Sequence, residues 1–416
     1  MIQFYRIIIN FLFLISPLIF LIRIIKKKEH PKRFKEKFGL FSEKRRKGKL
    51  IWFHGSSVGE LLSVIPLIEV LESRKDISQI LITSNTFSSS KVISKLNLKK
   101  TTHQFFPIDT NFLALKFLSY WKPHAVFFIE SEIWPNHIKA IKENNIPLVL
   151  INARITETTY LNWKKIDKFS KNIFNNFDLC LSQNKETAKF LKNLGSSKVF
   201  NIGNLKYSKY QTKDGNKIKG KTNNFFKRKK NLFGSFSTHP GEERFIAEIH
   251  LELKKKFTDL LTIIVPRHVD RSDIILEELN ELKLKVYVHS SNELIDNNTD
   301  IYLVDTFGET EEFMKKCPIV FLGGSIIKHG GQNPLEAARS GCKIIHGTNV
   351  YNFTEVYSLL KINKISKVIK NKSQALKIIK QNLGKKGISR RNIIKLDLIG
   401  KKILDDNIKV IKKYIA

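Results

Sequence analysis

Apolar residues dominate the N-terminal segment of the chain. Residues 7–22 include no charged side chain, and Ile24 and Ile25 extend this run beyond the single Arg23. A helix that crosses a bilayer needs about 20 apolar residues, so the run is long enough. Three lysines at 26–28 follow it, whereas only Arg6 precedes it. Because basic residues gather on the cytoplasmic side of a membrane segment, we predict that residues 1–28 form a single-pass anchor with the rest of the chain in the cytoplasm.

Two other interpretations of this segment are weaker. A cleaved signal peptide would carry its charge before the apolar run and a small-residue cleavage site after it, and the sequence has neither. A helix that lies in the membrane interface is the second alternative.

Beyond the anchor, short apolar runs alternate with segments of helical period. The helical stretch 58–71, for example, follows the apolar run Leu50-Ile51-Trp52-Phe53. Strands that alternate with helices predict parallel sheets covered on both faces, the α/β class. The predicted strands are 50–53, 79–83, 125–129, 147–151, 179–182 and 199–202 in the first half, and 231–235, 261–265, 285–289, 301–304 and 319–322 in the second.

The alternation breaks once, at residues 207–230. This stretch is polar and basic and has no hydrophobic period, which is typical of a linker. We therefore predict an N-terminal Rossmann-like domain at 29–206 and a C-terminal one at 231–416, with the last helix packing back on the N-terminal domain. Ligands of such sheets bind outside the carboxyl ends of the strands. A central cleft between two such domains suits a two-substrate reaction.

The composition is that of a folded protein with an unusual charge. The chain has 416 residues, enough for two buried cores, and 42% of them are hydrophobic. With 73 Lys and Arg against 38 Asp and Glu, the formal net charge is +35. Such a charge suits nucleic acid, an anionic membrane or an acidic substrate, but also lysine on a solvated surface. Three scattered cysteines exclude a disulfide framework and a structural zinc site.

Carboxylates follow two strands of the first half. Glu60 lies in the opening turn of the helix after His54, where the helix dipole favours a negative charge whatever its function. The functional alternative is a general base. Glu130 and Glu132 stand two residues apart directly after the strand 125–129. Charge beside an apolar sheet edge is uncommon as mere solvation, so this pair favours a functional role.

Small and basic residues follow the strands of the second half. Ser237 and Thr238 precede a helix start, where free N–H groups and hydroxyls suit an anion, although an ordinary N-cap explains them equally well. Pro266 and Arg267 end the next strand. The guanidinium of Arg267 suits a phosphate or carboxylate, and a surface ion pair is the simpler alternative.

A glycine-rich loop follows the strand 319–322. Gly323 and Gly324, with glycines at 330 and 331, allow a ligand to approach the backbone closely. Asn333 as N-cap, Pro334 at the first helical position and Glu336 at the third form a helix start that requires no function.

Nine motifs in order along the chain resemble one known family. They are HGSSVGE, ESEIWPN, NARITETTY, GNLKY, GSFSTHPGEE, VPRH, VDTFGE, FLGGS and HGGQNPLE. This series is similar to that of the bacterial 3-deoxy-D-manno-octulosonic acid (Kdo) transferases, which are inverting glycosyltransferases of the lipopolysaccharide inner core. The resemblance implies a GT-B fold, CMP-Kdo as donor and a lipid A precursor (lipid IVA) as acceptor at the inner membrane, with no cofactor and no metal.

The resemblance also implies roles for particular residues. Glu60 matches the family's proton acceptor, and Glu130 and Lys206 match two residues that assist the transition state. Contacts to CMP map onto Pro266 and Arg267, onto Phe307, Gly308 and Glu309, and onto Asn333, Pro334, Leu335 and Glu336. Ser237, Thr238 and Gly324 are added to this donor site from the strand-end argument, and Glu336 suits the ribose hydroxyls.

The chain departs from the family pattern in two places. Gly55-Ser56 replaces the usual Ala-Val, and the threonine-rich segment 83–88 lacks its glycine. These departures leave acceptor recognition open in that loop but do not touch the donor motifs.

Three expectations concern partners. Lysines in the blocks 26–37 and 44–49 are expected to face an anionic membrane leaflet. A GT-B enzyme that uses a UDP-sugar remains an alternative, although it does not account for ESEIWPN together with GNLKY. A basic nucleic-acid-binding protein is the remote alternative, because the aromatic residues lie mostly in predicted buried strands and no docking motif is present, so no nucleic-acid partner is expected.

Overall fold

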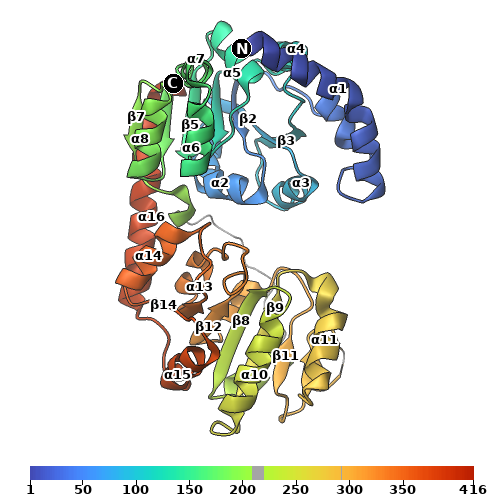
Figure 1. The fold of residues 1–416 in the computed structure, drawn as a ribbon, viewed down its shortest axis with the longest axis vertical. Helices are drawn as coiled ribbons and strands as arrows, with labels where there is room; N and C mark the ends of the chain where they lie inside the picture. The colour runs from blue at the N-terminus through green and yellow to red at the C-terminus, as the bar shows by residue number, and fades with distance from the viewer. Residues whose placement is uncertain (209–219, 292) are drawn as a thin grey trace. The chain divides into compact units, whose positions relative to one another are not determined.

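Two parallel sheets of seven strands each organise the chain in the computed structural model, which describes residues 1–208, 220–291 and 293–416 (Figure 1). All strand pairings in the described residues are parallel. This arrangement confirms the predicted α/β class. The residues divide into unit 1, Met1–Gln211 with Asp397–Ala416, and unit 2, Thr212–Leu396.

Unit 1 holds the first sheet and the helices that cover it. Its strands are β1 Lys49–His54, β2 Ile77–Ser84, β3 Thr101–Phe105, β4 Ala125–Ile129, β5 Leu148–Ala153, β6 Leu179–Ser182 and β7 Val199–Asn201. Its helices are α1 Ile2–Ile25, η1 Arg33–Phe38, α2 Val58–Glu72, α3 Phe87–Ser94, α4 Asn111–Trp121, α5 Pro135–Glu143, α6 Glu157–Lys164, α7 Asp167–Phe174, α8 Lys185–Asn193 and η2 Leu205–Tyr207.

Unit 2 repeats this plan. Its strands are β8 Leu232–Thr238, β9 Leu261–Pro266, β10 Val286–Val288, β11 Ile301–Leu303, β12 Ile319–Leu322, β13 Lys343–His346 and β14 Ser366–Val368. The helices are α9 Gly220–Arg228, α10 Glu242–Lys254, η3 Val269–Arg271, α11 Ser272–Glu281, α12 Thr310–Met314, α13 Leu335–Arg339, α14 Thr354–Ile362 and α15 Lys372–Asn382. The chain continues with α16 Arg390–Ile411, which begins in unit 2 and ends in unit 1, and with η4 Lys412–Tyr414 in unit 1.

Strand order creates one switch point in each sheet. The orders are β3-β2-β1-β4-β5-β6-β7 and β10-β11-β9-β8-β12-β13-β14. In both units the chain starts at a central strand, proceeds to one edge, and then returns to build the other edge. Loops therefore diverge at the carboxyl ends of β1 and β4, and again at those of β8 and β12. Ligands of doubly wound sheets bind at such points, and the candidate residues follow these four strands.

Strands β3, β13 and β14 are not among those predicted. The sequence of β3 is Thr-Thr-His-Gln-Phe, and β14 is only three residues long. Neither has the continuous apolar run by which a buried parallel strand is recognised. Pairing with β2 and with β13 decides their conformation.

The predicted linker at 207–230 is in part a helix. Residues 209–219 lie outside the described residues, but α9 occupies Gly220–Arg228. Its Phe225 and Phe226 are buried, and the Phe226 ring lies 5.0 Å from that of Tyr302. The basic character of the segment concealed this pair of aromatic anchors, so the predicted linker includes the helix α9.

The last residues of the chain belong to unit 1 rather than to unit 2. The Ser208 hydroxyl donates to the Gly400 carbonyl at 2.9 Å, and the Tyr414 hydroxyl donates to the Asp178 carbonyl at 3.1 Å. A Cβ at Gly400 would lie 1.9 Å from the Tyr207 carbonyl oxygen, so only glycine fits this approach.

Among the described residues, α1 is the one helix long and apolar enough to cross a membrane. It has 24 residues, and its mean hydropathy reaches 2.5. Only 6% of that apolar window is buried within the protein.

The basic block after α1 does not act as one surface. Lys26, Lys27, Lys28, Lys32 and Lys35 are exposed. Lys37 is instead buried, donates to Glu29 at 2.9 Å and to the Asn85 carbonyl at 2.9 Å, and lies over the ring of Phe20. Burial lowers the pKa of Lys37, and its hydrogen bond with Glu29 opposes that shift. The expectation that the block 26–37 faces a membrane is therefore wrong for Lys37.

Lys37→Met is expected to destabilise unit 1, because it removes one partner of a buried ion pair. We expect a loss of about 3 kcal/mol in the free energy of unfolding. Urea denaturation followed by tryptophan fluorescence reports on unit 1 alone, since tryptophans 52, 121, 134 and 163 all belong to it. The matched control Lys35→Met removes an exposed charge and should change the value by no more than about 0.5 kcal/mol. Equal stabilities of the two variants would show that the buried pair is dispensable.

Candidate active site

The start of α2 holds Glu60 in a defined position. The Ser57 side chain caps the helix by accepting from the Glu60 N–H at 3.3 Å, and the Ser57 hydroxyl donates to Glu60 Oε1 at 2.8 Å. The Ser56 N–H donates to Glu60 Oε2 at 2.7 Å. This arrangement is a variant of the capping box in which the glutamate accepts from the N–H one residue before the N-cap, so helix formation alone explains a glutamate at this position. Its ionisation behaviour decides whether it can also do chemistry.

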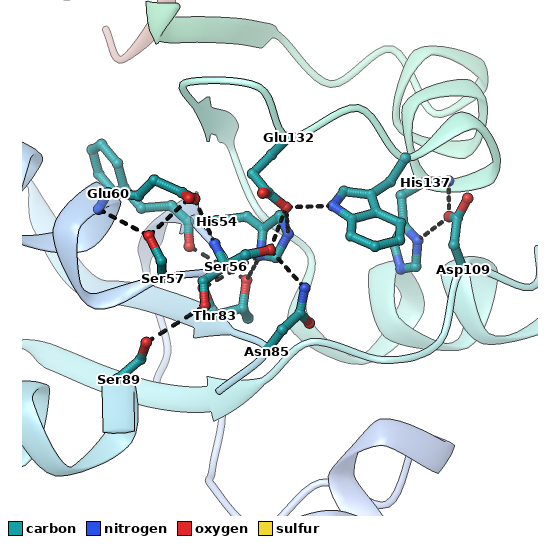
Figure 2. A network of polar contacts seen from close by, with 12 residues as sticks. His54, Ser56, Ser57, Glu60, Thr83, Asn85, Ser89, Asp109, Glu132 and His137 are labelled. Carbon is teal, nitrogen blue, oxygen red and sulfur yellow. Dashed lines mark hydrogen bonds and ion pairs between the residues drawn. The ribbon is translucent and has the colours of Figure 1, made fainter. Parts of the chain in front are cut away.

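A second carboxylate lies next to this turn. Glu132 follows β4, and its Oε2 accepts from the Ser56 hydroxyl at 2.7 Å and from the Trp134 indole N–H at 2.7 Å. His54, the last residue of β1, places Nε2 3.0 Å from the same oxygen. Figure 2 shows Glu132 above His54 and Ser56, with Glu60 on the α2 side of the network. One carboxylate oxygen thus connects the ends of β1 and β4.

The neighbours of His54 fix its ring. Its Nδ1 lies 3.0 Å from the Thr83 hydroxyl at the end of β2, and the ring stacks on Phe106 at 3.8 Å between centroids. The Asn85 amide donates to the Ser56 hydroxyl at 2.7 Å. The loops after β1, β2 and β4 therefore form one hydrogen-bonded network (Figure 2).

The two carboxylates differ in acidity. Burial and, after it, the negative charge of Glu132 together raise the pKa of Glu60 to about 7, against hydrogen bonds from Ser57 and Ser56 that lower it. Burial also acts to raise the pKa of Glu132, but the hydrogen bonds from His54, Ser56 and Trp134 outweigh it and the net shift is downward. Glu132 therefore holds the negative charge first, and Glu60 exchanges a proton near neutral pH.

Glu130 pairs with Lys206 at the same edge of the sheet. Lys206 Nζ lies 2.6 Å from Glu130 Oε1, and the Glu130 side chain is almost fully buried. The backbone of Glu130 has φ +55°, a conformation that non-glycine residues seldom adopt and that is concentrated at functional sites. The charge of Glu130 also contributes to raising the pKa of Glu60. The structure thus brings together Glu60, Glu130 and Lys206.

A chain of amide contacts positions Lys206. The Asn204 side chain caps η2 by accepting from the Lys206 N–H at 2.9 Å, and its amide donates to Gln183 at 2.9 Å. Asn152 at the end of β5 accepts from the Leu205 N–H at 2.9 Å and donates to the Ser63 hydroxyl of α2 at 3.3 Å. Asn152 therefore connects the Lys206 segment to the helix that carries Glu60.

In unit 2, Ser237, Thr238 and Arg267 lie at the ends of β8 and β9. Ser237 has φ +55°, and Thr238 is buried with its hydroxyl unpaired among the described residues. The Arg267 N–H donates to the Thr238 carbonyl at 3.0 Å, while its side chain is exposed beyond Pro266. Helix α10 begins only at Glu242, so neither Ser237 nor Thr238 caps it.

The amides of the glycine-rich loop are already occupied. Glu242 is buried, and its Oε2 accepts from the N–H of Gly324 at 2.7 Å and of His239 at 3.1 Å. Its Oε1 accepts from the N–H groups of Ser325 and Ile326, each at 3.1 Å. Gly324 therefore does not offer its N–H to a donor phosphate while Glu242 is in place. Its contribution is instead φ +66°, which brings the loop close to His329, Gln332 and His239.

The remaining donor-site candidates lie on two other loops. Glu309 accepts from the Thr306 hydroxyl at 2.8 Å and lies 3.0 Å from His289 Nε2, whereas Phe307 is 72% exposed and Gly308 has φ +98°. Asn333 Oδ1 accepts from the Leu335 N–H at 3.1 Å. Helix α13 begins at Leu335, one residue later than predicted, so Pro334 precedes the helix. Glu336 is exposed and accessible to a ligand.

The sequence predicts only part of this arrangement. The sequence indicates Glu132 only as one of an acidic pair, and it gives no signal for Glu242. Neither His54 nor Trp134 was selected. The signal was the spacing Glu-x-Glu-x-Trp, which places both acids and an indole donor in one loop. Within the described residues, no group of three or more His, Cys, Asp or Glu side chains is arranged to hold a metal ion.

Known proteins are similar to this chain in fold and in sequence. The solved structure of UDP-GlcNAc 2-epimerase from Neisseria meningitidis bound to UDP-GlcNAc is similar with a TM-score of 0.55, at 15% identity, over 88% of this chain and 99% of that one. The two Rossmann-like sheets are thus those of GT-B-type proteins. A family model for 3-deoxy-D-manno-octulosonic-acid transferase (kdotransferase) matches residues 32–209.

Curated relatives extend the match along the chain. A 3-deoxy-D-manno-octulosonic acid transferase of Rickettsia bellii is 33% identical over 97% of each chain. That of Haemophilus influenzae is 29% identical over 81% of this chain and 79% of its own. The chain therefore belongs to the Kdo transferase family and is a glycosyltransferase of lipopolysaccharide biosynthesis.

Glu242→Ala is expected to loosen the glycine-rich loop, because four N–H groups lose their acceptor. Hydrogen–deuterium exchange should show faster exchange of the Gly324, Ser325 and Ile326 amides, by roughly tenfold or more if about 1.4 kcal/mol of local stability is lost. The control Glu252→Ala removes a surface acid from the same helix and should leave these amides unchanged. Equal exchange in both variants would show that other contacts hold the loop.

Proposed function

We propose that this chain transfers Kdo from CMP-Kdo to a lipid A precursor, lipid IVA, at the cytoplasmic face of the inner membrane. In the reaction, Glu60 accepts the proton of an acceptor hydroxyl, whose oxygen bonds to the anomeric carbon of Kdo. The bond from that carbon to the phosphate of CMP breaks, and CMP leaves with the electron pair. Attack opposite the leaving group inverts the configuration.

The observation that carries this proposal is the environment of Glu60. Both of its oxygens accept hydrogen bonds at the start of α2, and its pKa is raised to about 7. A general base works best when its pKa lies near the working pH, because it is then both ionised and sufficiently basic. A carboxylate with an ordinary pKa would be a weaker proton acceptor.

Lys206 and Glu130 support the same step. Lys206 supplies a positive charge, and its pairing with Glu130 at 2.6 Å holds the ammonium in place. A fixed cation stabilises negative charge that develops on a leaving group or an acceptor oxygen in the transition state. We assign both residues to stabilisation of the transition state, as their match to the family motifs implies.

Unit 2 is the proposed donor-binding unit. Ser237, Thr238 and Arg267 share the carboxyl edge of β8 and β9, and the exposed Arg267 suits a phosphate. The carboxylate of Glu336, also exposed, can accept hydrogen bonds from ribose hydroxyls. The loop of Phe307, Gly308 and Glu309 and the segment Asn333, Pro334 and Leu335 complete the proposed nucleotide contacts.

The acceptor side accounts for the membrane segment. Lipid A precursors reside in a membrane, and an enzyme attached to the same leaflet meets them there. Helix α1 supplies apolar surface, and the exposed lysines 26–28 follow it. Each basic residue near an anionic leaflet adds about 1 kcal/mol of attraction. We therefore propose attachment to the inner membrane through α1, with both units in the cytoplasm.

Glu60→Gln is expected to reduce Kdo transfer by about 10²–10⁴-fold, because the amide cannot accept the proton. Mass spectrometry of the product formed from CMP-Kdo and a tetraacylated lipid A precursor measures the rate, and CMP binding should be unchanged. The control Glu157→Gln alters another glutamate in a first helical turn, that of α6, and should retain activity. Near wild-type transfer by Glu60→Gln would overturn the base assignment. Transfer from a UDP-sugar in the same assay would contradict the assignment of CMP-Kdo as the donor.

Glu132→Gln is expected to move the acid limb of the pH–rate profile to lower pH. A base must be deprotonated, so the wild-type rate should rise with pH around a midpoint near the Glu60 pKa of about 7. Removing the neighbouring negative charge lowers that pKa, and we expect a shift of about one pH unit. The control Glu143→Gln, an exposed acid of α5, should leave the midpoint in place. An unshifted midpoint in Glu132→Gln would show that its charge does not tune the base.

A further inference from the structure

Helix α1 contacts unit 1 along one narrow stripe. Its least exposed residues recur every three or four positions from the first turn to the last, which is the spacing of one helix face. They are Ile2, Tyr5, Arg6, Ile9, Phe13, Ser16, Phe20, Arg23 and Ile24. The helix therefore lies along the body of unit 1 over its whole length and does not project from it (Figure 1).

The N-terminal end of α1 is tied to α4 and α5. The Tyr5 hydroxyl donates to the buried Asp109 at 2.7 Å. Arg6 donates to Asn136 at 3.0 Å and to Asn111 at 2.7 Å. Asp109 also accepts from the N–H of His137 at 2.9 Å, so Tyr5 completes a network that belongs to the core of the unit.

The middle and the far end of the helix are held in the same way. Phe13 and Phe20 pack against Phe38 of η1, with ring centroids 5.8 and 5.5 Å apart. Arg23 donates to the buried Glu29 at 3.2 Å. Contacts at both ends and at the centre fix the direction of α1 relative to unit 1.

The rest of the helix surface is apolar and exposed. Leu14 is 75% exposed, Leu18 is 64% exposed and Phe11 is 64% exposed. The exposed large side chains are Phe4, Ile7, Ile8, Phe11, Leu12, Leu14, Ile15, Leu18, Ile19, Leu21, Ile22 and Ile25. We call this set the α1 outer face. An apolar surface of this size on a soluble molecule marks an interaction site.

These contacts are incompatible with a helix that spans the bilayer. Twenty-four residues of α-helix measure about 36 Å, and the hydrocarbon core is about 30 Å thick. If α1 crossed it, Tyr5 and Arg6 would lie on the side opposite Arg23. They could not then reach Asp109 and Asn136 in the unit that also holds Glu29.

We propose that α1 lies in the plane of the membrane, with the α1 outer face buried in an anionic lipid leaflet and its N-terminus on the same side as both units. An interfacial helix usually needs a polar face of its own. Here the polar side chains Tyr5, Arg6 and Arg23 lie on the stripe that unit 1 covers. The remaining exposed surface is mainly apolar, which explains how the helix can lie flat in lipid. The exposed lysines 26, 27, 28, 32 and 35 favour anionic lipid over a second copy of this chain.

This proposal rests on the proposed membrane attachment and replaces the single-pass anchor expected from the sequence. Hydropathy and flanking charge do not distinguish a spanning helix from an in-plane helix, since both require a long apolar helix followed by lysines. Only the contacts of Tyr5 and Arg6 distinguish them.

Cysteine accessibility in the full chain tests the orientation. The native Cys180, Cys317 and Cys342 are buried, so introduced cysteines can be read against a low background. Gln3→Cys reports the N-terminus, and Lys256→Cys reports the exposed surface of unit 2. A membrane-impermeant maleimide is applied to sealed inside-out vesicles and to sealed right-side-out vesicles. We expect both cysteines to react in the same preparation.

The outcomes distinguish a failure of the in-plane arrangement from a failure of membrane attachment. Gln3→Cys and Lys256→Cys reacting in opposite preparations would overturn the in-plane arrangement and leave membrane attachment intact. Recovery of the chain in the soluble fraction would overturn attachment itself. Kdo transfer by the solubilised protein is measured separately, so neither outcome bears on the proposed reaction.

A charge on the α1 outer face tests the occupant. Leu18→Glu should weaken binding to vesicles of phosphatidylglycerol and phosphatidylethanolamine by roughly tenfold or more. Gln3→Glu, which alters an exposed polar position, is the matched control. Wild-type binding should be weaker to phosphatidylcholine alone and should fall with salt. A lipid-free dimer that Leu18→Glu dissociates, together with unchanged vesicle binding, would assign the face to a second copy instead.

Discussion

Hydrogen bonds to a buried carboxylate connect the ends of the two strands, and the loops that follow them, at the switch point of each sheet. In unit 1, Glu132 follows β4 and accepts from Ser56, with His54 at the end of β1 on the same oxygen. In unit 2, Glu242 follows β8 and accepts from Gly324 and Ser325 after β12. The loops that follow these two strands diverge at this point, so the pairing of the strands does not hold the loops together. A carboxylate has enough acceptor sites to join them.

The same device has different consequences in the two units. Hydrogen bonds lower the pKa of Glu132, so its negative charge persists beside Glu60. Burial and this neighbouring charge together raise the pKa of Glu60 to about 7. The loop contact that builds the site thus also tunes it. In unit 2, Glu242 satisfies four backbone N–H groups that would otherwise suit a phosphate. The glycine-rich loop is therefore held by the protein's own carboxylate.

The proposed membrane attachment involves a similar division between neighbouring and distant contacts. The exposed lysines after α1 and the buried Lys37 stand within a few residues of one another, yet one set meets solvent and the other meets Glu29. Likewise, most of the surface of α1 is apolar, and unit 1 covers the stripe that carries Tyr5, Arg6 and Arg23. In the proposed arrangement, the residues that meet lipid are those of α1 that unit 1 leaves exposed.

The sequence by itself determined the α/β class, most strands, the apolar N-terminal helix and the motifs of the Kdo transferase family. These features depend on local period and on residues close together in the chain. Only the tertiary structure decided that Glu132 forms a hydrogen bond with His54, 78 residues away, and that the Gly324 N–H is already occupied. It also decided that two buried phenylalanines anchor α9 and that the Tyr5 hydroxyl reaches Asp109. Partners of buried polar groups come from strands that adjoin in the sheet but lie far apart in sequence, so no local pattern contains them.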